Sequence, residues 1–272
     1  MFKTIPDIAT RVAALQTGAV DIIGEGGIPP AFIVQLEREP TVRLSYAKGG
    51  GTNMHIGLET RKGAPLADRR VRLAIAHAID IDAIVKNVLG GRAQKTAALV
   101  TPYTVGYDPA IKGIPYDPEA AKKLLAEAGY ASGIDVTFNS SGGRYVNERE
   151  VVEALAAQMQ AVGIRAKVNY LEWGAYMASR DTMTGADMFM LGWSTGGEMD
   201  ADTQLYAILK CEAPFANFCD AQLDKLLVTT TSEMDPGARN KLWSQVQQYI
   251  VAQAPIIPLY AVDAVFAVGK RV

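Results

Sequence analysis

The sequence predicts an α/β protein in which a mixed β-sheet is flanked by helices. Strand-like segments alternate with helical segments along most of the 272 residues, a pattern that favours a mixed sheet over a sandwich or a helical bundle. Extended segments also lie near both ends of the chain. With 49% hydrophobic and 21% charged residues, a chain of this length can bury a substantial core.

The first 48 residues have the pattern strand, helix, strand, helix, strand. We expect these elements at residues 2–5, 7–17, 20–23, 30–37 and 42–47. In the first helix Ile8, Val12 and Leu15 share one face, and Gly18 is a natural terminator. So short an α/β segment rarely folds alone, and we expect it to pack with another part of the chain.

Residues 48–52, KGGGT, are the most flexible-looking part of the sequence, and we place a crossing between two lobes there. After a strand at residues 54–58, the segment 65–88 predicts two successive helices. The apolar residues at 71, 74, 75, 78 and 79 form one stripe, Asp68 is placed to cap the helix, and the arginines at 69, 70 and 72 are expected in solvent. The second helix starts at Asp80 or Asp82 and stops at Gly90.

The remainder of the chain repeats the alternation. Asp117, Pro118 and Glu119 provide a cap, a first-turn proline and an acidic residue, which together predict a helix that ends at Gly129. We then expect strands at residues 135–139, 165–171 and 188–193, with helices at residues 147–162, 174–183, 203–209, 221–230 and 236–254. Two extended segments, 255–260 and 262–268, close the chain.

Extended strands at both ends of the chain predict that these ends meet in a sheet outside the central α/β body. Residues 1–48 and 261–272 would then belong to one lobe, and residues 49–260 would form the other.

The composition disfavours several classes of partner. A formal net charge of −2 gives no electrostatic reason to bind nucleic acid or an anionic membrane. No apolar run reaches the roughly 18 residues that would cross a bilayer, and the first residues lack the apolar core of a signal peptide.

Cys211 and Cys219 are the two cysteines of the chain. Their spacing leaves two alternatives open, a disulfide closing a small loop or two free buried thiols. A metal site is less favoured, because CxxC spacing is lacking and both histidines, His55 and His77, are distant in sequence.

Several segments, taken in order, resemble one protein family. They are AALQTGAVD at 13–21, PLADRRVRLAIAHAIDIDAIV at 65–85, YDPEAAKKLL at 116–125, AGY at 128–130, GRY at 143–145, GW at 192–193 and PIIPLY at 255–260. With them the chain resembles the periplasmic solute-binding proteins of ABC importers, in the family 5 group that binds dipeptides, oligopeptides, nickel and glutathione. The resemblance covers essentially the whole chain.

This resemblance implies a receptor that captures a small peptide-like ligand and presents it to an ABC permease in the membrane. Family members are considerably longer, so the chain is expected to be a fragment: the complete second lobe with a small remnant of the first, whose other part is missing. A periplasmic location and a cystine between Cys211 and Cys219 are also implied. No cofactor and no metal are expected.

Trp193 is a candidate ligand contact, since a tryptophan at a strand end beside glycines can offer a flat apolar face to a ligand. The pattern alone favours a core position for Trp193, but the resemblance implies a place in the ligand cleft, where relatives have this Trp. The following segment, with Ser194, Thr195, Gly196 and Glu198, completes the candidate site. Gly196 stands where many peptide-binding relatives have an Asp for the ligand's α-ammonium group, which disfavours an ordinary dipeptide or oligopeptide. The segment GWST at 192–195 with the later Gly-Glu resembles the glutathione-type branch more closely. Trp173 and Trp243 are expected in the core.

Arg144 is the second candidate, with Tyr145 beside it. It lies in a loop between a strand end and a helix start, where a guanidinium can hold a carboxylate with two hydrogen bonds. A solvated surface arginine is the alternative.

Two other functions remain open. A hydrolase or transferase would use Arg144, Glu198 and His55, although no nucleophile motif accompanies the histidines. A non-catalytic interaction module would bind a protein partner through apolar surface. Asp200 and Asp202 are interpreted as helix-capping residues, because the spacing of an EF-hand is lacking.

Overall fold

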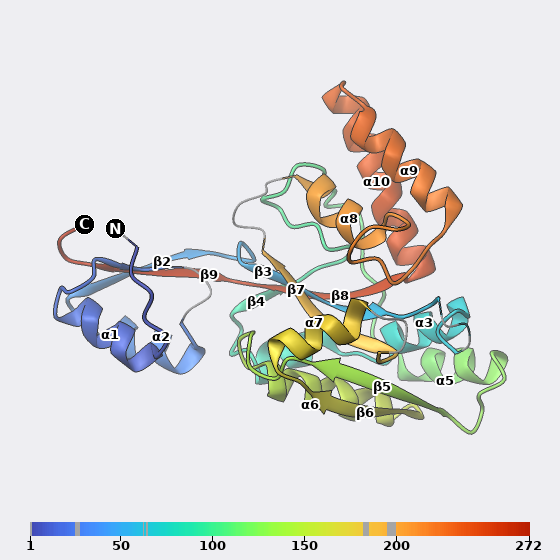
Figure 1. Ribbon diagram of the computed structural model, residues 1–272, viewed down its shortest axis with the longest axis horizontal. Helices are drawn as coiled ribbons and strands as arrows, with labels where there is room; N and C mark the ends of the chain where they lie inside the picture. Colours follow the sequence, from blue (N-terminus) through green and yellow to red (C-terminus); the bar gives the residue numbers. More distant parts are fainter. Residues whose placement is uncertain (1, 25–27, 62, 64, 182–184, 195–199) are drawn as a thin grey trace.

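The structure is a computed structural model that describes residues 2–24, 28–61, 63, 65–181, 185–194 and 200–272. It contains two β-sheets, each with its own helices (Figure 1). The segments up to Ala47 and from Ala264 form what we call the small unit, and the segment between them forms the large unit. Both termini lie in the small unit, at the end away from the large unit (Figure 1).

The small unit has a three-stranded antiparallel sheet in the order β1-β9-β2. Its elements are α1 (Ile8–Gln16), β1 (Ile22–Ile23), α2 (Pro30–Glu37), β2 (Val42–Ala47) and β9 (Ala264–Gly269). The N- and C-terminal segments therefore share a sheet, as the extended ends predict. The helices cover this sheet with a core of their own, which includes Val12, Leu15, Ile33, Leu36 and Ala267.

The strand expected at residues 2–5 is wrong. These residues have no regular structure in the described chain, and Phe2 is fully exposed. A strand needs a neighbour to receive its backbone hydrogen bonds, and the sheet in this unit is completed by β9 instead.

The large unit has a six-stranded mixed sheet in the order β4-β8-β3-β7-β5-β6. The strands are β3 (Thr52–Leu58), β4 (Ala93–Lys95), β5 (Ile134–Ser140), β6 (Ile164–Tyr170), β7 (Met188–Ser194) and β8 (Ile256–Val262). Strand β3 is central and pairs antiparallel with both β7 and β8, whereas β5 runs parallel to β6 and β7. The predicted mixed α/β class is confirmed.

Helices pack on both faces of this sheet (Figure 1). They are α3 (Arg69–His77), α4 (Ile81–Asn87), α5 (Pro118–Glu127), α6 (Glu148–Gln160), α7 (Trp173–Asp181), α8 (Ala201–Leu209), α9 (Ala221–Ser232) and α10 (Pro236–Gln253). The core formed with α3 to α6 contains Ile56, Val71 and Phe138, and the core formed with α8 to α10 contains Leu205, Leu223 and Trp243. Trp243 is fully buried, as expected.

Strand β4 was not predicted. It is three residues long, and both Gln94 and Lys95 are exposed. Such a short polar edge strand has no apolar alternation to reveal it.

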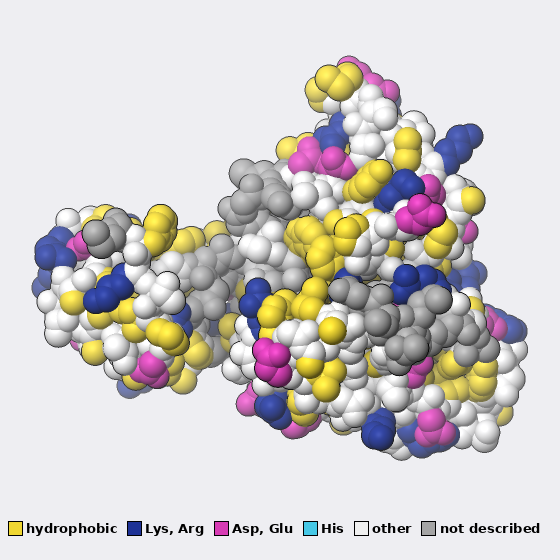
Figure 2. Space-filling model, in the orientation of Figure 1, with side chains coloured by type: hydrophobic (Ala, Val, Ile, Leu, Met, Phe, Trp, Pro, Cys, Tyr) yellow, Lys and Arg dark blue, Asp and Glu magenta, His cyan; other side chains and the backbone are white. Residues whose placement is uncertain are grey.

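Two connections join the units, one between β2 and β3 and the other between β8 and β9 (Figure 1). The backbone amide of Gly49 donates to Asp263 Oδ1 at 2.8 Å, and that of Gly51 donates to the Val262 carbonyl at 2.9 Å. Gly49 has φ +65°, a conformation that favours glycine. The molecule narrows at this crossing (Figure 2).

A polar contact also crosses between the units. Arg92 of the large unit pairs with Glu37 of the small unit at 2.7 Å, and the Tyr46 hydroxyl donates to the same carboxylate at 2.8 Å. The Arg92 guanidinium lies over the Tyr46 ring. These contacts hold α2 near the start of β4.

The expected helix starts are confirmed at Asp68, Asp80 and Asp117, whose side chains accept hydrogen bonds from first-turn amides. The expectation that Arg72 lies in solvent is wrong, because its side chain is buried. It donates to the carbonyls of Gln253 and Ala254, which end α10, and to those of Leu66 and Ala67. A guanidinium satisfies several otherwise unpaired carbonyls, so the α10 terminus can be buried against α3.

We therefore predict that Arg72→Leu lowers the free energy of unfolding by about 3 kcal/mol or more, because several buried carbonyls lose their donor. Arg69→Leu is the matched control. Arg69 is exposed and makes one hydrogen bond, to Ala252, so its loss should cost no more than about 1 kcal/mol. Urea denaturation measures both, and equal losses would contradict the role assigned to Arg72.

Candidate functional site

Strand β7 runs from the core to the surface, and Trp193 lies near its exposed end. Residues Met188 to Leu191 are buried, Gly192 and Trp193 are partly buried, and Ser194 is exposed. Register places Trp193 opposite Asn53 and Ser194 opposite Thr52, so the end of β7 lies beside the connection between the two units. Trp193 is not sealed in the interior, and its side chain packs against the core formed with α8 to α10.

The loop closed by the Cys211–Cys219 disulfide packs against Trp193. Cys211 and Cys219 are joined, with Cα atoms 4.8 Å apart, as the family resemblance implies. Within this loop Phe215 meets the Trp193 ring edge to face at 5.5 Å. Buried Arg180 lies 4.5 Å from the Phe215 ring centroid and donates to the Pro214 carbonyl at 3.0 Å. The loop, and with it the Trp193 ring, is therefore held in place.

The loop between β5 and α6 is organised around the buried carboxylate of Glu148. This carboxylate accepts the hydroxyls of Ser140 and Ser141 and the backbone amides of Ser141, Gly143, Arg144 and Tyr145. Burial opposes its ionisation, but the two serine hydroxyls and the amides outweigh burial and lower the pKa of Glu148. The charge of Glu148 thus fixes the backbone of the predicted Arg144 loop.

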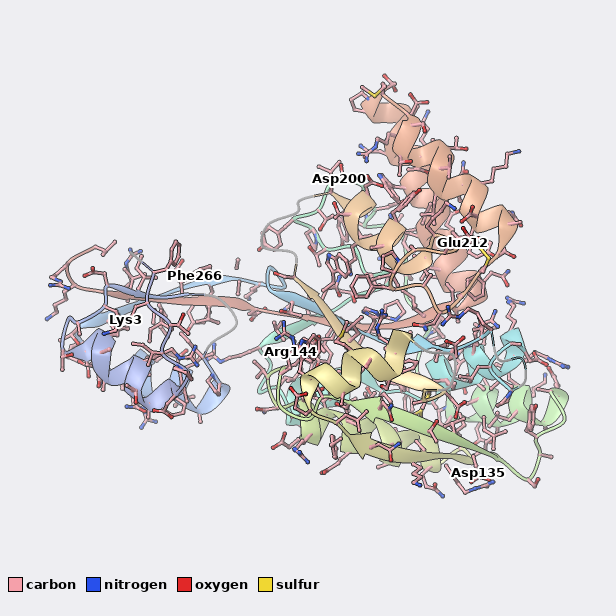
Figure 3. All side chains as sticks on the ribbon, viewed as in Figure 1. Lys3, Asp135, Arg144, Asp200, Glu212 and Phe266 are labelled. Atoms are coloured by element: carbon pink, nitrogen blue, oxygen red, sulfur yellow. A yellow bond between two sulfur atoms is a disulfide. The ribbon has the colours of Figure 1, made fainter. Side chains whose placement is uncertain are left out.

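The Arg144 side chain is exposed at the edge of the large unit that faces the connecting strands (Figure 3). Its guanidinium carbon lies 4.2 Å from the Trp173 ring centroid and 6.0 Å from that of Tyr145. Stacking on an aromatic ring restrains a guanidinium while leaving its N–H groups available in the plane of the guanidinium itself. Arg144 is therefore restrained and accessible, as a carboxylate ligand would require.

Trp173, which was expected in the core, is instead a partly buried residue at the start of α7. It stacks on Tyr176 at 5.5 Å, and the buried Tyr176 hydroxyl donates to the Met190 carbonyl on β7 at 2.5 Å. Sequence reasoning missed Trp173 because its partner, Arg144, is distant in the chain. Its position between a strand end and a helix start was the available signal.

Tyr145 joins the Arg144 loop to the Trp193 strand. Its hydroxyl donates to the Gly192 carbonyl at 3.4 Å, and burial raises the pKa of this phenol. The structure therefore brings Tyr145 and the Trp193 segment together, and Arg144 lies over the rings of Tyr145 and Trp173. Thr195, Gly196 and Glu198 lie outside the described residues.

His55 does not join this group. It is buried on β3, where burial and the nearby Arg180 charge lower its pKa to about 3, so the imidazole is neutral at ordinary pH. His77 contacts the Pro115 carbonyl through Nδ1 at 2.9 Å. Asp200 caps α8 by accepting from the Asp202 amide, as expected.

The described part of the chain contains no cluster of three or more His, Cys, Asp or Glu side chains suited to a metal ion. None of its helices has the length and hydropathy needed to span a membrane.

Comparisons with known proteins agree on one family. Residues 1–215 match the family model described as bacterial extracellular solute-binding proteins, family 5 Middle. The chain is 30% identical over 266 residues to di/tripeptide-binding protein 1 of Pseudomonas aeruginosa and 31% identical over 271 residues to heme-binding protein A of Haemophilus influenzae. In each case the match covers 95% of this chain and 48% of the relative.

The fold matches as well. A periplasmic binding protein of Helicobacter pylori, solved with the peptide STSA, superposes with a TM-score of 0.86 at 28% identity, over 98% of this chain and 52% of that one. The chain spans about half the length of the curated relatives it matches.

Gly192 is required at the junction of the site. A Cβ atom there would lie 2.7 Å from the Tyr145 ring, 2.5 Å from Thr52 and 2.6 Å from the Met54 sulfur. We predict that Gly192→Ala lowers the free energy of unfolding by about 1–3 kcal/mol through overpacking. Gly143→Ala, where a Cβ meets nothing within 4 Å, should have little effect. Thermal or urea denaturation distinguishes them, and equal stability of the two variants would show that β7 shifts freely.

Glu148 should make stability depend on pH. Because the pKa of Glu148 is lowered in the fold, its contribution is complete above the ordinary value of 4.5 and is lost as the pH falls through the lower folded value. At pH 7 we expect Glu148→Gln to cost about 2–4 kcal/mol, a difference from wild type that shrinks below pH 4.5.

Glu150→Gln is the matched control on the same helix, since Glu150 is exposed; it should change stability by less than about 0.5 kcal/mol. Urea denaturation at a series of pH values provides the measurement. A constant difference between Glu148→Gln and wild type across this range would rule out a charged Glu148 as the organising group.

Proposed function

Because the chain belongs to family 5 of the bacterial extracellular solute-binding proteins, we propose that it captures a peptide-like solute for an ABC importer. The observation that carries this proposal is the Arg144 guanidinium, which is exposed yet restrained on Trp173 while its backbone is fixed by Glu148. Such a group binds a carboxylate without first losing much conformational freedom.

We assign residues 49–260 to the ligand-binding lobe and residues 1–48 and 261–272 to a first lobe. Two observations support this division: the small unit has its own sheet and its own core, and only two connections join it to the large unit. In this proposal the connecting strands act as a hinge, and closure of the lobes buries the solute.

Each predicted residue has a role in this proposal. Arg144 binds the solute's carboxylate, Trp193 offers its flat face to the apolar part, and Tyr145 keeps the two segments together. Ser194, Thr195 and Glu198 would supply polar contacts. Gly196 provides no carboxylate for an α-ammonium group, so an ordinary dipeptide would lack that ion pair and a glutathione-like solute is the favoured ligand.

The proposed setting is the periplasm, where the Cys211–Cys219 disulfide is stable and where the loaded protein would meet its permease. The hydrolase alternative gains no support, because His55 is buried and uncharged.

Isothermal titration calorimetry with glutathione, dipeptides, tripeptides and hemin tests the proposal. Binding is measured on this chain and on a chimera that adds the first part of a dipeptide-binding relative. We predict binding of a peptide-like solute, with Arg144→Gln weakening it by roughly 10- to 100-fold. Hemin binding without peptide binding, or turnover of a solute, would overturn the proposal.

Arg165→Gln is the matched control for Arg144. Arg165 pairs with Asp135 at 2.7 Å, and Asp135 lies far from Arg144 at the opposite side of the large unit (Figure 3). Its loss should leave affinity unchanged. Equal effects of the two variants would exclude a specific contact by Arg144.

A further inference from the structure

A hollow in the large unit lies beside the connection between the units and is lined by residues other than the candidate ligand contacts. It is a pocket of about 700 Å³ between the sheet edge at β4 and the loop formed by residues 96–115. Its volume falls in the range of roughly 300–1,000 Å³ that is typical of small-molecule sites. Arg144, Tyr145, Trp193 and Ser194 do not line it.

Strand β3, with the buried side chain of Asn53, lies between this pocket and Trp193. Register places Asn53 between Ala261, which lines the pocket, and Trp193. With strands about 4.8 Å apart, Ala261 and Trp193 are roughly 10 Å from each other. The fully buried Asn53 side chain donates to the Leu99 carbonyl at 2.5 Å and accepts from Thr96 Oγ1 at 3.2 Å. The loop is therefore tied to the sheet between the two sites.

Hydrogen bonds from α8 and α10 also hold the loop that forms this pocket. Gln247 on α10 donates to the Gly106 carbonyl at 2.8 Å, and Ser244 donates to Asp108 at 2.6 Å. The Ala201 amide at the start of α8 donates to the Val105 carbonyl at 3.0 Å. Since α8 and α10 anchor the loop at these points, the pocket is preformed. Ligand binding would therefore cost little conformational entropy of the loop.

The charged part of the lining is predominantly cationic. Lys48, Lys95 and Lys112 line the pocket, and Asp108 is the acidic residue among its described lining. Asp108 already accepts hydrogen bonds from Ser244 and the Ala110 amide. The Lys95 ammonium forms an ion pair with the Asp82 carboxylate at 3.3 Å. Among the described residues, Lys48 has no ion-pair partner. The balance of charge favours an anion.

The lining also includes apolar and aromatic side chains. Val100 and Ile111 contribute aliphatic surface, and Tyr103 and Tyr107 are 44% and 41% exposed. Large aromatic side chains left this exposed beside a concave surface are available for a flat ligand. A small inorganic anion would occupy only a small part of this volume, so the lining fits an organic anion better.

We propose that this pocket is a binding site of its own for a small organic carboxylate with a flat apolar body. The carboxylate faces the ammonium groups of Lys48 and Lys112, and the apolar body lies against Tyr103 and Tyr107. The site goes beyond the proposed solute-binding function, because Arg144, Tyr145, Trp193 and Ser194 do not line it; it shares with that function only the connecting segment at Lys48 and Gly49.

An NMR titration of the ¹⁵N-labelled chain with phenylacetate tests this site. We expect saturable amide shifts concentrated at residues 95–112, with a Kd in roughly the millimolar range for so small a ligand. Phenylacetamide, the uncharged match, should bind roughly tenfold more weakly, and the double variant Lys48→Gln, Lys112→Gln should weaken phenylacetate by about the same factor.

Two control variants test whether phenylacetate binds in this pocket and not elsewhere on the chain. Lys167→Gln removes an exposed lysine from β6, the opposite edge strand of the sheet, and should not alter the Kd. Arg144→Gln should also leave it unchanged, so that failure of this site and failure of the solute site are separable. Equal binding of phenylacetamide, unchanged affinity in the double variant, shifts centred on Trp193 and Arg144, or absence of saturation would each overturn the proposal.

Discussion

The fold depends on two paired connections that carry the chain between two separate cores. Strand β2 of the small sheet leads into β3, the centre of the large sheet, and β8 leads back into β9, the centre of the small sheet. Hydrogen bonds from the Gly49 amide to Asp263 and from the Gly51 amide to the Val262 carbonyl join these two chain connections to each other. Because the same two chain segments connect the two cores, a small backbone rotation in these segments would move one unit relative to the other.

The candidate site is built on the sheet at this crossing. The end of β7 lies beside β3 next to the connection, and the Arg144 loop reaches it through Tyr145. The supports are internal and charged: Glu148 organises one loop and Arg180 holds the other. A buried charge with as many hydrogen-bond partners as Glu148 has fixes the backbone around it.

Local sequence patterns predicted most of the elements. The α2 and β2 bounds agree with the expected residues, and the aspartate caps at residues 68 and 117 were identified from capping chemistry alone. Hydrophobic periodicity failed where the environment was unusual. Arg72 lies next to an apolar stripe and was expected in solvent, but the carbonyls that bury it belong to α10, 181 and 182 positions away.

The sequence by itself determined the fold class and most of the helices and strands, because caps, turns and apolar periodicity act over a few neighbouring residues. Arg144, Tyr145 and Trp193 became candidates through the family resemblance, together with their places at strand and helix ends. Only the tertiary structure decided that Trp173 lies under Arg144, that Phe215 supports Trp193, and that three lysines share a pocket with two tyrosines. These contacts join residues far apart in the chain, and sheet pairing, which brings them together, is specified by the packing of the whole core and not by any local segment.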